Sequence, residues 1–238
     1  MALIADLARG LVDLVYPRLC LVCERPAERY FCSACRDQLV RDPFPTCPRC
    51  GSTVGPHTSS VSGCPRCRDE HYAFAGVLRM GPYEGMRRDL ILRMKHDVLV
   101  AQAVGEEFAE RITPRMVHTG IFAVVPVPLH WKRRWRRGYN QADVLAKALA
   151  EKLRVPCWSR LLKRRRMTIF QAGLPPTARR ENLRGAIMAR RLQWNCLQDK
   201  AVLLVDDVFT TGSTAHAAAV ALKAAGAKSV YVAVAAHG

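Results

Sequence analysis

Two adjacent carboxylates stand directly before a loop of hydroxyl-bearing residues near the end of the chain. The acids are Asp206 and Asp207, within AVLLVDDVFTTGSTAHAAAVALKAAGAKSVYVAVAA, residues 201–236. Backbone N–H groups at the start of a helix attract an anion, and glycine lets the chain approach it closely. Carboxylates do not favour phosphate, so their partner must be sugar hydroxyls or a metal ion. A phosphate cradle beside a diol acceptor describes a ribose 5-phosphate group. The loop residues are Thr210, Thr211, Gly212, Ser213 and Thr214.

The residues around this loop predict a strand, a helix and a second strand. Residues 201–205 form a continuous apolar run, as expected of a strand covered on both faces. Residues 215–225 favour a helix, Gly226 would end it, and residues 229–235 indicate the next strand. The loop then lies at the carboxyl end of a strand, where open α/β sheets bind ligands. Similar alternation from residue 71 onward predicts an α/β domain with a parallel sheet over residues 71–238.

The acidic pair and its loop resemble a known motif. Four apolar residues, two acids, two further residues and Thr-Thr-Gly-x-Thr match the phosphoribosyl pyrophosphate (PRPP) motif of type I phosphoribosyltransferases. The resemblance implies a Rossmann-like phosphoribosyltransferase fold, with Asp206 and Asp207 on the ribose hydroxyls and residues 210–214 on the 5-phosphate. The alternative is an ordinary acidic strand end followed by a helix cap.

Eight of the ten cysteines form four C-x-x-C pairs. Two residues between thiolates let both sulfurs of a tight turn point at one tetrahedral zinc ion, so four pairs predict two complete sites. The alternatives are a disulfide framework, which needs an oxidising compartment, and a redox motif, which four successive pairs without a preceding strand disfavour. The expected zinc ligands are Cys20, Cys23, Cys32, Cys35, Cys47, Cys50, Cys64 and Cys67.

The two zinc ions are expected to build structure, because closed four-thiolate sites leave no open coordination position for chemistry. Residues 41–63 are too polar to form a core without metal. Together with a short amphipathic helix near the N-terminus, they predict a zinc-ribbon module over residues 1–70. Sequential pairing of the C-x-x-C pairs is the default, and the spacing leaves an interleaved arrangement open.

The net charge of +17 predicts polyanionic partners, such as nucleic acid or diphosphates. The densest cationic cluster lies in a loop at residues 130–141, between an apolar strand at residues 121–127 and an amphipathic helix. Its aromatic residues and guanidinium groups together suit stacked bases on a cationic groove. Two alternatives stay open: a solvated basic surface, and a pyrophosphate loop whose tryptophans pack in the core. The candidate nucleic-acid residues are Trp131, Lys132, Arg133, Arg134, Trp135 and Arg136.

Nearly the whole chain resembles the ComF family of competence-associated proteins. The resemblance rests on the paired cysteines, PVPL at residues 126–129, RGYNQA at residues 137–142 and the acidic-pair motif. It implies that the basic loop borders the pyrophosphate end of the ligand pocket, with Arg137 among the ligand-binding residues. It also implies a mobile flap that contains Thr168, Gln171, Arg179 and Asn182.

Two functions follow from these observations. The first is an accessory in DNA uptake that binds PRPP and single-stranded DNA, with a DNA-uptake helicase as a further partner. The second is an active phosphoribosyltransferase, a glycosyltransferase that moves ribose 5-phosphate from PRPP to an unidentified acceptor. Asp206 and Asp207 would then be catalytic, and Mg²⁺ would stabilise the departing pyrophosphate. No segment specifies a nucleobase pocket, which favours the first function.

The sequence contains neither a recognisable export signal nor an apolar run long enough to span a bilayer. Asp6 and Asp13 interrupt the apolar residues of the N-terminal segment, which lacks a basic region before them. We therefore expect a cytoplasmic protein without stable membrane insertion.

Overall fold

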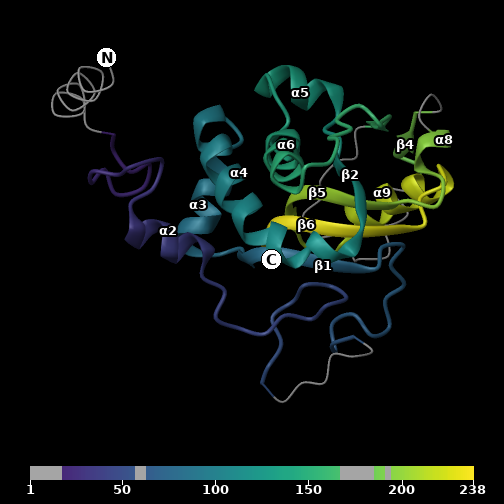
Figure 1. Ribbon diagram of the computed structural model, residues 1–238, viewed down its shortest axis with the longest axis horizontal. Coiled ribbons are helices and arrows are strands. Elements are labelled where there is room, and N and C mark those ends of the chain that lie inside the picture. The colour runs from purple at the N-terminus through teal and green to yellow at the C-terminus, as the bar shows by residue number, and fades with distance from the viewer. Residues whose placement is uncertain (1–17, 57–62, 167–184, 191–193) are drawn as a thin grey trace. The chain divides into compact units, whose positions relative to one another are not determined.

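The computed structural model describes residues 18–56, 63–166, 185–190 and 194–238 (Figure 1). By packing, the chain divides into two units, Met1–Arg41 and Asp42–Gly238. In the first unit the described residues include helix α2 (Ser33–Val40) and a β-bridge between Leu19 and Pro26. The predicted N-terminal amphipathic helix lies outside the described residues. None of the described helices is long and apolar enough to cross a bilayer.

A four-stranded parallel sheet organises the second unit. Its neighbours in order are β1 (Gly76–Pro82), β6 (Ser229–His237), β5 (Ala201–Phe209) and β2 (Ile121–Pro126). All three ladders are parallel. The two inner strands are almost entirely apolar up to their carboxyl ends, as burial on both faces requires. The predicted parallel α/β fold is confirmed, and β5 extends past residue 205 to include both acids.

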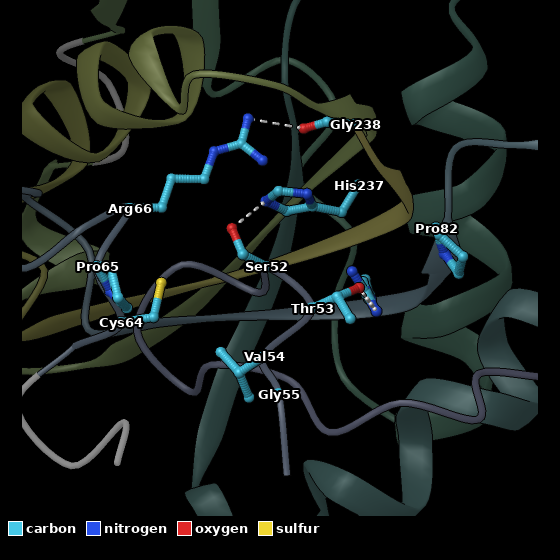
Figure 2. Close-up of a pocket in the computed structure, with 11 residues that line it drawn as sticks. Ser52, Thr53, Val54, Gly55, Cys64, Pro65, Arg66, Pro82, His237 and Gly238 are labelled. Carbon is cyan, nitrogen blue, oxygen red and sulfur yellow. Dashed lines mark hydrogen bonds between the residues drawn. The ribbon is translucent and has the colours of Figure 1, made fainter. Parts of the chain in front are cut away.

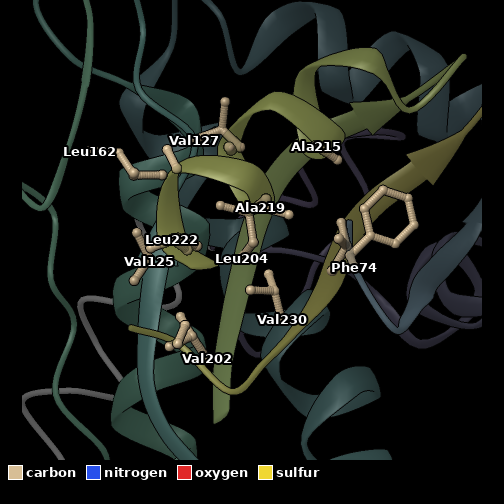
Figure 3. Packing of buried hydrophobic residues seen from close by; sticks show 14 of the residues in the cluster. Phe74, Val125, Val127, Leu162, Val202, Leu204, Ala215, Ala219, Leu222 and Val230 are labelled. Atoms are coloured by element: carbon tan, nitrogen blue, oxygen red, sulfur yellow. The ribbon is translucent and has the colours of Figure 1, made fainter. Parts of the chain in front are cut away.

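Helices cover both faces of this sheet. On one face α9 (Ser213–Ala224) packs its alanines and Leu222 against Val202 and Leu204 of β5 (Figure 3). Because side chains alternate along a strand, the intervening residues of β5 face the other layer. There α6 (Gln141–Leu153) packs on β2 and β5, and α4 (Val98–Ile112) packs on α6. The remaining helical segments are α3 (Gly85–Arg93), α5 (Trp131–Arg137), α8 (Trp194–Leu197) and two 3₁₀ turns at Thr113–Arg115 and Val117–Thr119.

A short antiparallel pair lies against α9. Its strands are β3 (Leu162–Arg164) and β4 (Ile187–Ala189), and their side chains Leu162 and Ile187 join the core beneath that helix. The pair brackets residues 167–184 along the chain. The four predicted flap residues, Thr168, Gln171, Arg179 and Asn182, lie outside the described residues.

The segment that contains Cys47, Cys50, Cys64 and Cys67, called the second zinc ribbon below, packs on β1 at the edge of the sheet. The N–H of Val77 in β1 donates to the carbonyl of Pro48 at 3.2 Å. Gly76 permits this approach, because a Cβ at that position would lie 2.7 Å from the same carbonyl oxygen. The ribbon is therefore part of the unit that contains the sheet. The predicted domain boundary at residue 70 stays a prediction.

A buried ion pair also ties the start of this unit to β1. Arg79 points from β1 to Asp42, with its Nε 2.8 Å and its Nη2 2.9 Å from the carboxylate oxygens. The same guanidinium donates to Thr53 Oγ1 at 2.8 Å. Only 1% of the Arg79 side chain and 7% of the Asp42 side chain are exposed. One arginine thus joins three segments of the second unit.

Asp42→Ala should lower the free energy of unfolding by about 3–5 kcal/mol, because it leaves the Arg79 charge buried and unpaired. Asp89→Ala is the control, since Asp89 pairs with Arg88 on the surface and should change stability by only about 0.5 kcal/mol. Denaturant unfolding of both variants measures the difference. Equal effects of the two substitutions would contradict a structural role for the buried pair.

Candidate functional site

The predicted phosphate loop joins β5 to α9 at the carboxyl end of the sheet. Gly212 has φ +74°, and a Cβ there would come within 2.6 Å of the Phe209 ring, so the turn requires glycine. Thr211 Oγ1 and Ser213 Oγ lie 2.9 Å apart. The 12-residue helix begins at Ser213, where the first N–H groups of a helix have no intrahelical acceptor. The local geometry therefore matches an anion site at a helix N-terminus.

Asp206 and Asp207 lie near the carboxyl end of β5, beyond the point where its ladder to β2 ends. The final pair of that ladder is Pro126 with Val205, whereas the ladder to β6 continues to Phe209. The N–H of Asp207 donates to Asp206 Oδ1 at 2.9 Å, and that of Val208 donates to Asp207 Oδ1 at 2.8 Å. One oxygen of each carboxylate thus accepts a hydrogen bond from the N–H of the next residue and fixes the backbone there.

Burial raises the pKa of Asp206 well above its ordinary value, and the neighbouring charge of Asp207 raises it further. Two guanidinium groups act on this pair. Burial lowers the pKa of Arg137, at the end of α5, and the Asp207 carboxylate opposes that shift. Burial likewise lowers the pKa of Arg164, at the end of β3, and Asp206 opposes it. The site therefore combines two acids with two partly buried cations.

The tertiary structure adds Arg164 to the candidate site. The sequence did not single out Arg164, which belongs to the basic run of residues 163–166, and its only local signal is its position before the predicted flap. Arg137 was predicted, and the fold brings it near Asp207. Its Nε is buried and lacks a hydrogen-bond partner among the described residues. Both guanidinium groups thus act on the acids through their charge, from different elements of the fold.

The prediction of a loop at residues 130–141 is wrong, because residues 131–137 of this segment form helix α5. His130 Nδ1 accepts from the N–H of Lys132 at 3.4 Å to start the helix. Gly138, at φ +79°, ends it, and its N–H donates to the carbonyl of Arg134 at 2.8 Å. The sequence hid this helix because five of its seven residues are cationic, which leaves only two tryptophans as an apolar signal.

Both tryptophans of α5 face solvent. Trp131 is 64% exposed and Trp135 is 86% exposed, so the alternative in which they pack in the core is wrong. A spacing of four residues places the two rings on one face of the helix. Lys132 Nζ lies 5.5 Å from the centroid of the Trp131 ring. Arg133 is partly buried, while Arg134 and Arg136 are exposed.

The eight paired cysteines gather into two clusters in chain order, which is the sequential arrangement. In each cluster the four sulfur atoms lie within 4.8 Å of one another, with closest separations near 3.6 Å. Zinc–sulfur bonds of about 2.3 Å place tetrahedral ligands about 3.8 Å apart, so both clusters fit zinc. A disulfide needs a separation of about 2.05 Å, and all ten cysteines are free thiols. The clusters are Cys20, Cys23, Cys32 and Cys35, and Cys47, Cys50, Cys64 and Cys67.

Polar neighbours support the thiolate form of these ligands. Arg25 Nε donates to Cys23 Sγ at 3.5 Å, and this contact lowers the pKa of the Cys23 thiol to about 6. In the second cluster Ser52 Oγ lies 3.2 Å from Cys50 Sγ. The Arg25 contact favours the thiolate that zinc binds, whereas burial raises the pKa of the Cys50 thiol, which donates to Ser52.

Comparisons with known proteins agree with both halves of this description. A double zinc ribbon domain matches residues 11–68, and a phosphoribosyl transferase domain matches residues 144–238. The DNA utilization protein YhgH of Escherichia coli K12 is 31% identical over 92% of this chain and 96% of its own length. Competence protein F of Haemophilus influenzae is 30% identical over 87% of this chain and 90% of its own length. The chain belongs to the ComF family.

A more distant relative aligns over a similar share of both chains. Competence protein ComFC of Bacillus subtilis is 24% identical over 86% of this chain and 88% of its own length. The resemblance that the sequence motifs indicated is thus confirmed along almost the entire length of these relatives. This ComF-family protein combines a double zinc ribbon with a phosphoribosyltransferase domain.

Purified ComF-family protein should contain close to two zinc ions per chain. The double variant Cys47→Ser/Cys50→Ser should retain one zinc and lose much of the stability of the second unit, since metal binding replaces a missing core. Elemental analysis and thermal unfolding measure the two effects. Cys196→Ser is the control, because Cys196 is exposed and outside both clusters. A folded wild-type protein with one zinc or none would refute the assignment.

Proposed function

We propose that this ComF-family protein binds PRPP, or another ribose 5-phosphate ligand, at the end of β5 and single-stranded DNA along α5. It would act as a cytoplasmic accessory in DNA uptake. The observation that carries the proposal is that α5 faces solvent along its length and acts on the acidic pair at its end. Its exposed face presents Trp131 and Trp135, while the charge of Arg137 at its end interacts with Asp207. A DNA-uptake helicase as a further partner stays a prediction from the family resemblance.

The proposed ligand takes its contacts from three parts of the fold. The N-terminus of α9 and the hydroxyls of residues 210–214 would hold the 5-phosphate. Asp206 and Asp207 would accept hydrogen bonds from the ribose hydroxyls, for which each keeps one carboxylate oxygen beyond the backbone contacts. Arg137 and Arg164 would face the pyrophosphate, whose negative charge offsets the cost of burying two cations.

The carboxylate pair also fits Mg²⁺, which prefers oxygen ligands and commonly binds between one or two carboxylates and a substrate phosphate. Asp206 and Asp207 would hold the ion together with the pyrophosphate. When bound, it would neutralise charge on the diphosphate. The desolvated position of Asp206 supports this, because a nearby cation favours its ionised form.

Replacing both acids, in Asp206→Asn/Asp207→Asn, should weaken PRPP binding at least a hundredfold. Each lost charge-assisted hydrogen bond is worth about 1.5–3 kcal/mol. Titration calorimetry measures the affinity, and thermal unfolding checks that the variant is folded. Since burial raises the pKa of Asp206, PRPP affinity of the wild type should also decline on acidification at a higher pH than an ordinary aspartate would give. Asp199→Asn, outside the site, is the control, and unchanged affinity in the double variant would remove the proposed site.

Base stacking and charge should contribute separately to the binding of single-stranded DNA along α5. Trp135→Ala should weaken binding of single-stranded DNA by about 1–3 kcal/mol, because its exposed ring can stack on a base. Arg136→Ala should instead flatten the salt dependence, since each phosphate contact releases counterions. Binding titrations over a salt series measure both effects. Phe44→Ala is the control, an exposed aromatic residue outside α5. Absence of DNA binding at low salt, with normal PRPP binding, would contradict this half of the proposal.

An active phosphoribosyltransferase is the second candidate function. The acids directly precede the phosphate loop in the chain, and the charges of Arg137 and Arg164 act on them. In this arrangement pyrophosphate can leave the anomeric carbon toward cations while the ribose stays fixed. Release of pyrophosphate from PRPP that depends on an added acceptor would establish this activity.

A further inference from the structure

Helix α5 has two different faces. Of its seven residues only Arg133 and Arg137 are partly buried, and the other five are exposed. Residues four apart lie on the same side of a helix, so these two arginines share one face and Trp131 and Trp135 share another. At about 100° per residue, the two faces lie on nearly opposite sides of the helix. They are called the inner face, with the arginines, and the outer face, with the tryptophans.

The charges of the inner face act on the proposed ligand site. The charge of Arg137 interacts with that of Asp207. The charge of Arg133 acts on Arg164, whose guanidinium also interacts with Asp206. The inner face is therefore coupled electrically to both acids and to the second cation that would face the pyrophosphate, whereas the outer face is free for a different ligand.

The cations at the inner face also repel one another. Burial lowers the pKa of Arg137 and of Arg164, and the charge of Arg133 lowers both further. Burial likewise lowers the pKa of His130, directly before the helix, and the charges of Arg164 and Arg133 add to that shift. A diphosphate would bring negative charge to this group of cations and replace their repulsion by attraction.

The contacts that hold α5 in place are few and polar. All seven of its residues are described, and none of them is buried. The segment that carries the helix is closed at its base, where Asn140 Nδ2 donates to the carbonyl of Val127 at 3.0 Å. Above this base, Arg134 Nη2 lies 3.9 Å from the carboxylate of Asp143 in α6, and the arginine side chain is 58% exposed (Figure 1). Exposed ion pairs contribute little to stability, and so short a helix is marginal by itself. The order of α5 therefore depends on the charge at its inner face.

We propose that binding of PRPP and binding of single-stranded DNA are positively coupled through α5. The diphosphate stabilises the helix from its inner face, and the stabilised helix holds Trp131 and Trp135 on the outer face for the strand. Coupling between two sites is reciprocal, so the strand raises the affinity for PRPP by the same factor. The inference rests on both halves of the proposed function and adds how one site regulates the other.

Direct repulsion between the two anionic ligands opposes this coupling. The helix between them is about 10 Å thick, and the Debye length is about 8 Å at an ionic strength of about 0.15 M. Repulsion across the helix is therefore largely screened. The attraction of the diphosphate for Arg133 and Arg137 acts at shorter range on partly buried groups, which salt screens less. The coupling should therefore be positive at physiological ionic strength.

Anisotropy titrations of a labelled thymidine oligonucleotide with the full chain, at physiological ionic strength and constant Mg²⁺, test the coupling. Saturating PRPP should tighten DNA binding about tenfold, within the usual range for coupled sites. Calorimetric titration with PRPP should show the same factor when the oligonucleotide is saturating. Ribose 5-phosphate is the matched ligand control, since it lacks the diphosphate and should leave the DNA affinity nearly unchanged.

Hydrogen exchange of the α5 amides reports on the helix itself. PRPP alone should slow exchange in residues 131–137, because exchange of a hydrogen-bonded amide requires local opening. This readout needs no DNA and no substitution.

Two arginines of α5 separate the inner face from the rest of the helix. Arg133→Gln should bring the coupling factor toward one, because it removes a cation that the diphosphate neutralises. Arg136→Gln is the matched control, since Arg136 is exposed and its loss should weaken DNA binding but keep the coupling factor. Thermal unfolding checks that both variants are folded.

Three outcomes would overturn the coupling: independent binding of PRPP and the oligonucleotide, competition between them, or a coupling factor that Arg133→Gln leaves unchanged. Unchanged exchange of the α5 amides with PRPP bound would exclude the helix as the connecting element. Failure of PRPP or of DNA to bind at all would instead refute that half of the proposed function, and the coupling with it.

Discussion

The unequal length of the two ladders of β5 is the constraint on which the site depends. Toward β2 the pairing stops at Val205, and toward β6 it continues to Phe209. The last four residues of the strand are therefore held on one side and open on the other. The open side leaves room for the carboxylates of Asp206 and Asp207, and the paired side brings Phe209 onto His237. One difference in strand pairing thus leaves the proposed sugar site on the unpaired side of the strand end and Phe209 packed on β6 at the paired side.

The charges at this strand end are held at a cost in stability. Burial disfavours the ionised form of Asp206, and it also disfavours the charged forms of Arg137 and Arg164. The opposite charges compensate this cost only in part, since burial still raises the pKa of Asp206 and lowers those of Arg137 and Arg164. A diphosphate with Mg²⁺ would satisfy both sets of groups. Such unsatisfied electrostatics are typical of sites shaped for a ligand.

The second zinc ribbon has a structural and a positioning role in this picture. Its polar sequence cannot form a core, so the four thiolates replace one. The contact of Pro48 with Val77 and the pair of Arg79 with Asp42 then fix the ribbon to β1. Ser52 and Arg66 lie beside the carboxyl end of β6 as a result (Figure 2). A metal site without open coordination positions can therefore still position side chains at the end of the sheet.

Local patterns in the sequence were sufficient for much of this protein. The C-x-x-C spacing predicted both zinc clusters, because a tight turn alone brings two sulfurs together. The apolar runs predicted β2, β5, β6 and α9 to within a few residues, because these elements are buried and regular. The acidic pair and the glycine-containing loop likewise stand in one continuous segment, so their proximity needed no tertiary information.

Only the tertiary structure decided the rest. The α5 segment is a helix although none of its residues is buried, since His130 caps its start and Gly138 ends it. The charge of Arg164 acts on Asp206 through the packing of distant segments, because β3 pairs with β4 and both strands contact α9. Ser52 meets His237 across 185 residues of chain, so no local pattern could predict this contact. Spacing along a chain fixes what neighbours in sequence can do together, whereas packing decides which distant side chains meet.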